Sequence, residues 1–310
     1  MPENKLHRRD WMRGLAAGST ALLLRRPISA QQQPPPIKAT KLTDNISLVT
    51  GDGGNIAVVT APDGLLLIDA GLPDRAADLV QSIAGISPQP VRTLFNTHWH
   101  MDHVGANVTL GKGGTRIVAH ENVRARLSVK TTMESMNRTF DPLEPAGLPT
   151  MTFTGAGKLY HGKETIQYAH IPLAHTDGDA YAFFPSVNVL HTGDLLFNGF
   201  YPVIDYSTGG WVGGMAVAAG RLLALCDAET RIIPGHGPLA NTSDLRAARD
   251  MLETATERLV LMSKQGKTAD EAVAAQPTKD LDEKWGRGFF KPEAWVRIAY
   301  TSVLRHNQRA

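Results

Sequence analysis

The chain has 310 residues, of which 42% are hydrophobic and 20% are charged, and its formal net charge is +2. This length and composition allow one large globular domain, or two at most, with a sizeable core. The single cysteine excludes an internal disulfide framework and a metal cluster built from thiolates.

Residues 1–30 have the pattern of an export signal. A basic start that contains the pair Arg8-Arg9 is followed by an apolar run from Gly14 to Leu24 and a small-residue end. The run is too short to span a bilayer. The paired arginines and the Gly/Ala-rich centre resemble a twin-arginine signal, with a Sec signal or an uncleaved anchor as the alternatives. We therefore predict an exported, periplasmic protein without a stable membrane span once it is processed.

The predicted signal also accounts for the basic balance of the whole sequence. It carries six of the 32 Lys/Arg residues and two of the 30 Asp/Glu residues, which leaves 26 basic and 28 acidic residues in the mature chain. The mature chain then has a formal charge of −2, and nothing in it points to a nucleic-acid partner.

Residues 31–36, three glutamines and three prolines, predict an extended tether before a folded domain that begins near residue 37. Short apolar runs then alternate with turn residues, which is typical of strands joined by hairpins. The run from Leu65 to Ile68 is apolar throughout, as expected for a strand buried on both faces, and it ends at Asp69. Residues 73–84 have the apolar spacing of a helix.

The next predicted strand, residues 91–96, leads into a cluster of metal-ligand side chains. His98 and His100 should project to the same side of the extended chain that leaves the strand. Neutral imidazoles and carboxylates are ligands that Zn²⁺ and similar divalent cations prefer. Asp102 and His103 are adjacent and must point in different directions, so a second metal beside the first is the natural way to use both. A histidine-rich polar loop without a metal is the alternative.

Three more candidate ligands, His175, Asp194 and His236, each follow a predicted strand and have a glycine nearby. We expect them to be loop residues at strand ends, where α/β folds place their chemistry. Any one of them alone is more typical of a structural residue, but together with the first cluster they favour a metal site. Residues 121–150 are predicted to form a helix and a loop that overhang this site, and residues 241–310 are predicted to be helical.

These motifs resemble the metallo-β-lactamase superfamily from about residue 40 to residue 240. The cluster His-x-His-x-Asp-His of that family is present, and its later histidine, aspartate and final histidine follow in the same order. Asp69 falls in the family's Asp-x-Gly turn and would support the ligands together with Thr97. The resemblance implies an α/β fold: an αββα sandwich over residues 37–240 with the metal site at one edge. The apolar spacing after residue 240 adds the expectation of a helical C-terminal extension over residues 241–310, packed on the same domain.

The resemblance also implies a pair of metal ions, two Zn²⁺ with iron or manganese as alternatives. A bridging hydroxide would then attack the substrate, and Asp102 would orient this nucleophile and carry a proton to the leaving group. The implied ligands are His98, His100 and His175 for one metal, Asp102, His103 and His236 for the other, and Asp194 as the bridge.

The ligand set narrows the choice within the superfamily. Lactamase subclasses with a cysteine ligand carry it where this chain has Asp194, and Cys226 lies in an apolar helical stretch that is typical of a core. The chain therefore looks closer to the glyoxalase II, lactonase and acyl-thioesterase branch. Export argues against cytosolic thioesters, so carboxylic esters, lactones and β-lactams remain.

The leading hypothesis is an exported dinuclear zinc hydrolase that opens an ester, lactone or β-lactam-type carbonyl of a small molecule. The alternatives are a mononuclear iron oxidoreductase like the persulfide dioxygenases, a true β-lactamase with a main role in antibiotic catabolism, and a metal-binding protein without catalysis. The sequence makes no prediction of the oligomeric state. Aromatic and polar residues in or after the ligand motifs are predicted to line the substrate pocket, namely Trp99, Asn198, Phe200, Tyr201 and Trp211.

Overall fold

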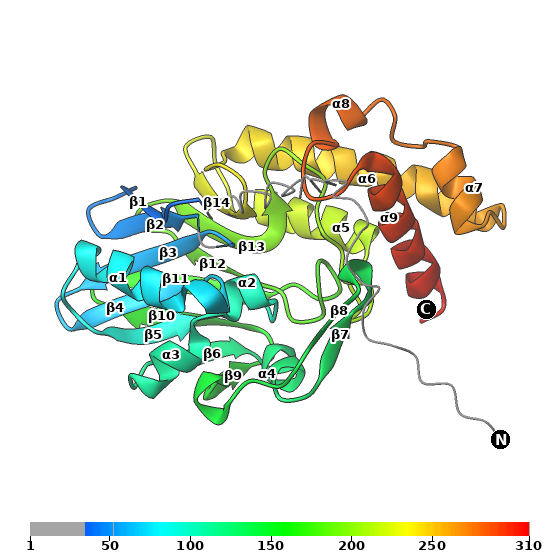
Figure 1. Ribbon diagram of the computed structural model, residues 1–310. Helices are drawn as coiled ribbons and strands as arrows, with labels where there is room; N and C mark the ends of the chain where they lie inside the picture. The colour runs from blue at the N-terminus through cyan, green and yellow to red at the C-terminus, as the bar shows by residue number, and fades with distance from the viewer. Residues whose placement is uncertain (1–34, 52, 310) are drawn as a thin grey trace, which may run out of the picture. The chain divides into compact units, whose positions relative to one another are not determined.

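A computed structural model describes residues 35–51 and 53–309 (Figure 1). The predicted export signal and most of the predicted tether lie outside the described residues. Within the described part of the chain, every helix is too short or too polar to cross a bilayer.

The first sheet has seven strands in the order β1-β2-β3-β4-β5-β6-β9, with β1 and β9 as its outer strands. The first four strands pair antiparallel as hairpins, and the last four pair parallel. The strands are β1 (Lys38–Lys41), β2 (Ile46–Thr50), β3 (Ile56–Ala61), β4 (Gly64–Ile68), β5 (Val91–Phe95), β6 (Arg116–His120) and β9 (Met151–Phe153). The connecting helices are η1 (Pro73–Arg75), α1 (Ala76–Ile86), α2 (Met101–Val104), α3 (Asn107–Lys112), α4 (Glu121–Leu127) and η3 (Pro145–Gly147).

The second sheet has five strands in the order β10-β11-β12-β13-β14. Its pairs are antiparallel except for β13 and β14, which run parallel and are connected through α5. The strands are β10 (Ala156–His161), β11 (Glu164–His170), β12 (Ala180–Phe184), β13 (Val189–Phe197) and β14 (Arg231–His236). The helices are α5 (Val212–Leu223), α6 (Thr242–Lys264), α7 (Ala269–Ala274), α8 (Asp282–Trp285) and α9 (Pro292–Asn307).

The two sheets pack face to face between two layers of helices. In β4, Leu65 and Leu67 pack in one core with residues of α1 and α3, whereas Leu66 and Ile68 pack in another core against the second sheet. This division follows from the alternation of side chains along a strand. Helices α5 and α6 pack on the other face of the second sheet, on the side away from α1, and α9 packs on these two helices (Figure 1). The predicted αββα sandwich is confirmed.

The C-terminal helices hold the segment that follows β13. The ring of Trp295 in α9 stacks on Tyr201 with the ring centroids 4.0 Å apart, and its Nε1–H donates a hydrogen bond to the carbonyl of Pro202. Helix α7 begins with a capping box of Thr268 and Glu271. These contacts fix the chain that passes beside the candidate ligands.

Three local predictions need correction. Asp194 is not a loop residue: it lies inside β13, where the pairing with β14 shifts register around Gly193. Such a bulge turns a side chain toward a new direction while the strand continues. His236 is the last residue of β14 rather than a loop residue. The segment between α4 and β9 is largely a hairpin of β7 (Thr131–Met133) and β8 (Arg138–Phe140) around η2 (Glu134–Met136).

Two histidines from different sheets form a stacked pair. The rings of His120 at the end of β6 and His170 at the end of β11 lie 3.8 Å apart between centroids. His120 also caps α4, because its Nδ1 accepts a hydrogen bond from the N–H of Asn122. Burial and the neighbouring His170 lower the pKa of His120, and burial lowers the pKa of His170. The folded chain therefore favours the neutral form of both rings.

We expect this pair to reduce stability in mild acid. The unfolded chain takes up protons near the ordinary histidine pKa of about 6.5, whereas the folded pair resists protonation. The free energy of unfolding should therefore be unaffected above this pH and decrease as the pH falls below it. The variant His120→Asn keeps a capping acceptor but cannot be protonated, so its stability should fall less. Urea unfolding at about pH 7.5 and about pH 5.5, with a chelator in every sample, measures this difference. Equal pH dependence in both proteins would contradict it.

Candidate metal centre

Seven ligand-type side chains meet at one end of the two sheets. The loop after β5 supplies two histidines, α2 supplies an aspartate and a histidine, and the remaining three come from the second sheet or the loop after β11. They form two groups, and within each group one ligand atom per residue lies within 4.8 Å of the others. The first group is His98, His100, His175 and Asp194, and the second is Asp102, His103 and His236. The structure thus brings all seven predicted ligands together.

The carboxylate of Asp194 lies between the two groups. Its Oδ2 is 3.2 Å from Nε2 of His175 and 3.7 Å from Nε2 of His98. Its Oδ1 is 3.0 Å from Nε2 of His103 and 3.4 Å from Nε2 of His236. Each oxygen therefore faces a different group, which is the placement that a carboxylate bridging two cations requires.

Asp69 orients His103 from behind. The Nδ1–H of His103 donates a hydrogen bond to Oδ2 of Asp69 at 2.7 Å, which leaves Nε2 directed at the other ligands. Thr97 donates to both oxygens of this carboxylate, from its backbone N–H at 2.8 Å and from its hydroxyl at 2.7 Å. Asp69 has a φ of 67°, a left-handed conformation that aspartate tolerates better than most residues. Both residues thus support the ligand ring, as histidine-binding carboxylates commonly do in metal sites.

The rings of the first group are likewise held through the nitrogen that faces away from the centre. His175 Nδ1 donates to the carbonyl of Val203 at 2.8 Å. His98 Nδ1 lies 3.1 Å from the hydroxyl of Thr97. His100 is turned the other way: its Nε2 lies 3.3 Å from Oδ2 of Asp205, and its Nδ1 faces His175.

Asp205 is a functional residue that the sequence reasoning missed. It is fully buried and accepts hydrogen bonds from the hydroxyls of Ser207 and Thr208 as well as its contact with His100. Hydrogen bonds to the charged form and the nearby His100 outweigh burial and lower the pKa of this carboxyl. Asp205 lies in no recognisable motif, so only its place beside the ligand reveals its role.

The two groups differ in their protonation. Burial lowers the pKa of His175 to about 4, and it also lowers that of His98. Burial acts in the same direction on His236, but the carboxylates of Asp194 and Asp102 outweigh it and raise the pKa to about 9. Where no metal is bound, protons on the second group balance the buried carboxylates.

The donor set fits divalent cations. Nε2 of His98 and Oδ1 of Asp194 are buried and have no hydrogen-bond partner among the described residues. Buried polar atoms normally have hydrogen bonds, so a nitrogen and an oxygen without one at the centre of a ligand cluster suit a bound cation. Imidazole nitrogens and carboxylate oxygens favour zinc, iron or manganese over calcium.

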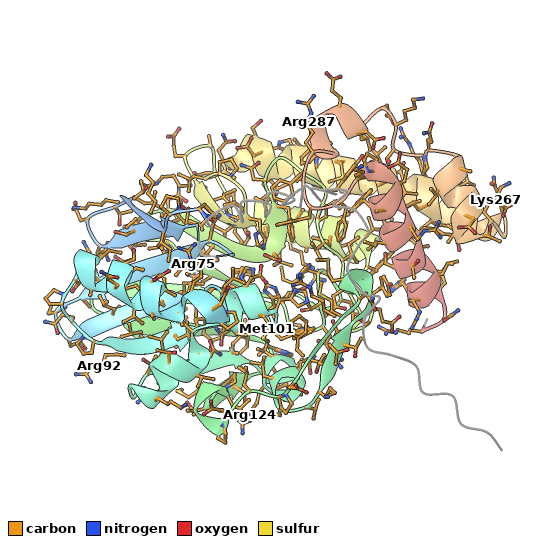
Figure 2. All side chains as sticks on the ribbon, in the orientation of Figure 1. Arg75, Arg92, Met101, Arg124, Lys267 and Arg287 are labelled. Carbon is orange, nitrogen blue, oxygen red and sulfur yellow. The ribbon has the colours of Figure 1, made fainter. Side chains whose placement is uncertain are left out.

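A cavity of about 390 Å³ opens beside the two groups. Four of the ligand residues contribute to its wall, and most of the remaining wall is apolar. Met101, labelled on α2 in Figure 2, is part of this wall. The lining residues are Gly53, Leu72, His100, Met101, Asp102, Met133, Met136, Arg138, Phe140, Asp194, Val203, His236 and Phe289.

None of the five residues predicted to line the pocket is part of this wall. Trp99 is buried and packs edge-on against Phe140. Tyr201 stacks on Trp295 in the core, and the three other predicted residues, Asn198, Phe200 and Trp211, contact neighbouring loops and helices. The correction has a physical cause: aromatic side chains after Asp194 pack against the C-terminal part of the chain, and the segment from β7 to β8 supplies part of the wall instead.

Comparisons with known proteins agree with this fold and with the position of the ligand groups in the chain. The model of the metallo-beta-lactamase superfamily matches residues 49–261. The chain is 28% identical over 202 residues to hydroxyacylglutathione hydrolase GloC from Haemophilus influenzae, which covers 65% of this chain and 89% of that protein. It is 23% identical over 256 residues to a linear primary-alkylsulfatase from Pseudomonas sp., which covers 70% of this chain and 48% of that protein. This chain thus spans about half of the alkylsulfatase.

Among solved structures, a metallo-beta-lactamase from Pontibacter korlensis superposes with a TM-score of 0.58. It shares 20% sequence identity and covers 70% of this chain and 99% of its own. At this identity the likeness concerns the fold alone. Residues 49–261, which the superfamily model matches, include every residue of the two ligand groups.

Proposed function

Because the chain belongs to the metallo-beta-lactamase superfamily, we propose that it is an exported hydrolase that uses two zinc ions to cleave a carboxylic ester, lactone or β-lactam-type carbonyl. The observation that carries this proposal is the position of Asp194, whose two oxygens face different ligand groups. Export rests on the pattern of residues 1–30 alone.

Bound zinc ions would polarise the substrate carbonyl and generate a nucleophile from water at neutral pH. The chain's own residues would hold and orient this pair. Asp194 places one carboxylate oxygen on each side, and Asp69 keeps His103 in the tautomer whose Nε2 is free. Asp205 contacts Nε2 of His100 and so favours the tautomer in which Nδ1 of that ring is free.

Asp102 is the residue placed to move a proton. Its carboxylate is 31% exposed, lines the cavity and lies 3.1 Å from Nε2 of His236. Burial raises its pKa, but the neighbouring His103 and His236 outweigh burial and lower it, so the carboxylate is ionised at neutral pH. An ionised carboxylate at the cavity wall can accept a proton from the nucleophile and pass it to the leaving group.

The relatives agree with hydrolysis of an acyl or sulfate ester. GloC is named as a hydroxyacylglutathione hydrolase and the Pseudomonas protein as an alkylsulfatase. Both names describe hydrolysis of a derivative of an acid, an acyl group in the first and a sulfate in the second. The largely apolar cavity of this chain favours a substrate with a hydrophobic body. We place carboxylic esters and lactones first, with sulfate esters as a comparison in the test.

We expect about two zinc ions per chain, which agrees with two ligand groups. Metal content is measured by mass spectrometry on protein purified without added metal.

Hydrolysis of an aryl ester, a lactone, nitrocefin and decyl sulfate is followed before and after chelation, and again after zinc is restored. Chelation should abolish the activity and zinc should restore it. About one iron per chain with oxygen uptake and no hydrolysis would overturn the proposal in favour of an oxidoreductase. A metal-loaded protein that is inert on the whole panel would indicate binding without catalysis.

A further inference from the structure

The β7–β8 hairpin presents one face to the cavity and the other to solvent. Met133 pairs with Arg138 in its register, and Thr132 pairs with Thr139. The hydroxyls of the two threonines are 2.9 Å apart on the exposed face. Because cross-strand partners share a face, Arg138 lies on the same side as Met133 and Phe140, and all three line the cavity.

The acidic residues of the hairpin are engaged elsewhere. Glu134 forms an ion pair with Arg305 of α9 at 2.9 Å, and Asp141 forms one with Lys130 at 2.9 Å. The two aspartates in the cavity wall contact histidines of the metal centre. Arg138 is exposed, and within residues 35–51 and 53–309 its side chain has no hydrogen bond or ion pair. Apart from the four ligand residues, it is the one charged residue among those that line the cavity.

The rest of the wall suits a flexible hydrophobic body. Three methionines, Met101, Met133 and Met136, line it together with Phe140 and Phe289. Methionine is unbranched and polarisable, and it adapts to apolar groups of different shapes. The guanidinium of an arginine presents a planar fork of donors that matches a carboxylate or a sulfate group.

We infer that Arg138 is a specificity-determining residue that binds an anionic group of the substrate, and that the substrate is an amphiphile whose apolar body lies against the methionines. The anionic group is distinct from the bond that is cleaved. This inference rests on the proposed hydrolase function and narrows its substrate class. Arg138 and the apolar side chains of Met133 and Phe140 lie on the same face of one hairpin, so this hairpin would contact both the anionic group and the apolar body of the substrate.

The kinetic test compares two esters that differ only in charge. One is a 4-nitrophenyl ester of an eight-carbon diacid with a free terminal carboxylate, and the other is its terminal methyl ester. We expect the intact enzyme to prefer the carboxylate by about tenfold in kcat/KM, mainly through KM, because a charge-assisted contact away from the reacting bond adds uniform binding. Arg138→Gln should remove the preference, because kcat/KM should fall more for the carboxylate substrate than for the methyl ester. Arg138→Lys, which keeps the charge without the fork, should restore part of it.

The matched control is Arg116→Gln. Arg116 is exposed on β6 and lies outside the cavity wall, so this variant should keep the preference of the intact enzyme. An equal preference in Arg138→Gln and in the intact enzyme would overturn the inference.

A binding measurement separates this inference from the proposed function. Calorimetric titration with octanesulfonate and with octanoate uses probes that the enzyme cannot hydrolyse, and it distinguishes sulfate-like from carboxylate-like groups. Arg138→Gln should weaken binding of the preferred probe by about five- to tenfold, whereas Arg116→Gln should not change it. Arg138-dependent binding without any ester hydrolysis would refute the hydrolase and support the anion site. Ester hydrolysis with binding that is independent of Arg138 would refute the anion site and support the hydrolase.

Discussion

Replacing Asp194 with asparagine is expected to lower kcat/KM for ester or lactone hydrolysis by about a thousandfold, which is the scale of losing a key electrostatic group in an active site. The carboxylate offers one oxygen to each group, with Nε2 of His175 at 3.2 Å on one side and Nε2 of His103 at 3.0 Å on the other. An amide keeps the shape but has a single acceptor and no charge. We therefore expect the variant to bind about one zinc ion or fewer, because the shared ligand is lost.

Mass spectrometry of metal content and steady-state kinetics on the same sample test this expectation. The matched control is Glu164→Gln, which removes the charge of another buried carboxylate. Glu164 is at the start of β11 and bonds to Asn45, away from both ligand groups. The control should keep its metal and its activity. Two zinc ions and near-normal turnover in Asp194→Asn would show that this carboxylate does not bridge.

The second large effect is expected from Asp69→Asn, which should weaken zinc binding by about 10- to 100-fold. The asparagine can still accept from the N–H of Thr97, but its amide nitrogen cannot accept the Nδ1–H of His103. The imidazole is then driven to the other tautomer, with a proton on the nitrogen that would hold the metal. Asparagine tolerates the left-handed backbone at this position, so the fold should persist.

Competition with a chromophoric chelator measures the affinity, and circular dichroism checks the fold. Excess zinc should restore activity to Asp69→Asn, because only the orientation of a ligand is weakened, but not to Asp194→Asn. Thr97→Val removes one of the hydrogen bonds to Asp69 and should have a smaller effect. Unchanged zinc affinity in Asp69→Asn would show that the carboxylate does not set the tautomer of His103.

The ligand cluster could be recognised from the sequence because its chemistry is local. His98, His100, Asp102 and His103 fall within six residues, and a short loop after a strand must place them near one another. The order of the later histidines and the aspartate resembled a known family. The alternation of strands and helices indicated the layers, which the packing of Leu66 and Leu67 into different cores confirms.

The surroundings of the cluster could not be found in this way. Asp205 contacts His100 across 105 positions of the sequence, and nothing in its neighbours distinguishes it from a turn residue. Tyr201 was expected in the pocket because it is aromatic and follows Asp194, yet Trp295 holds it in the core. The choice between pocket and core depends on where the C-terminal helices pack, which is a long-range property.

The hairpin that forms the cavity wall was predicted as a helix and a loop. Its strands have only three residues each, which is too short for an alternating pattern to stand out. Arg138 therefore gave no signal in the sequence. The role that we propose for Arg138 depends on the strand register, which pairs it with Met133, and on the cavity that this face of the hairpin lines.

The outer strands of the first sheet bear on how the protein behaves at high concentration. An open strand edge is a template for pairing with another molecule, and proteins protect such edges with charge or with short length. Here β1 is exposed along its length and has Lys38 and Lys41 at its two ends, and β9 is only three residues long. Two molecules that approach through β1 bring like charges together, and β9 offers too few groups to nucleate a ladder. Within the part of the chain that the structure describes, both outer strands of this sheet are therefore of a kind that disfavours pairing between molecules.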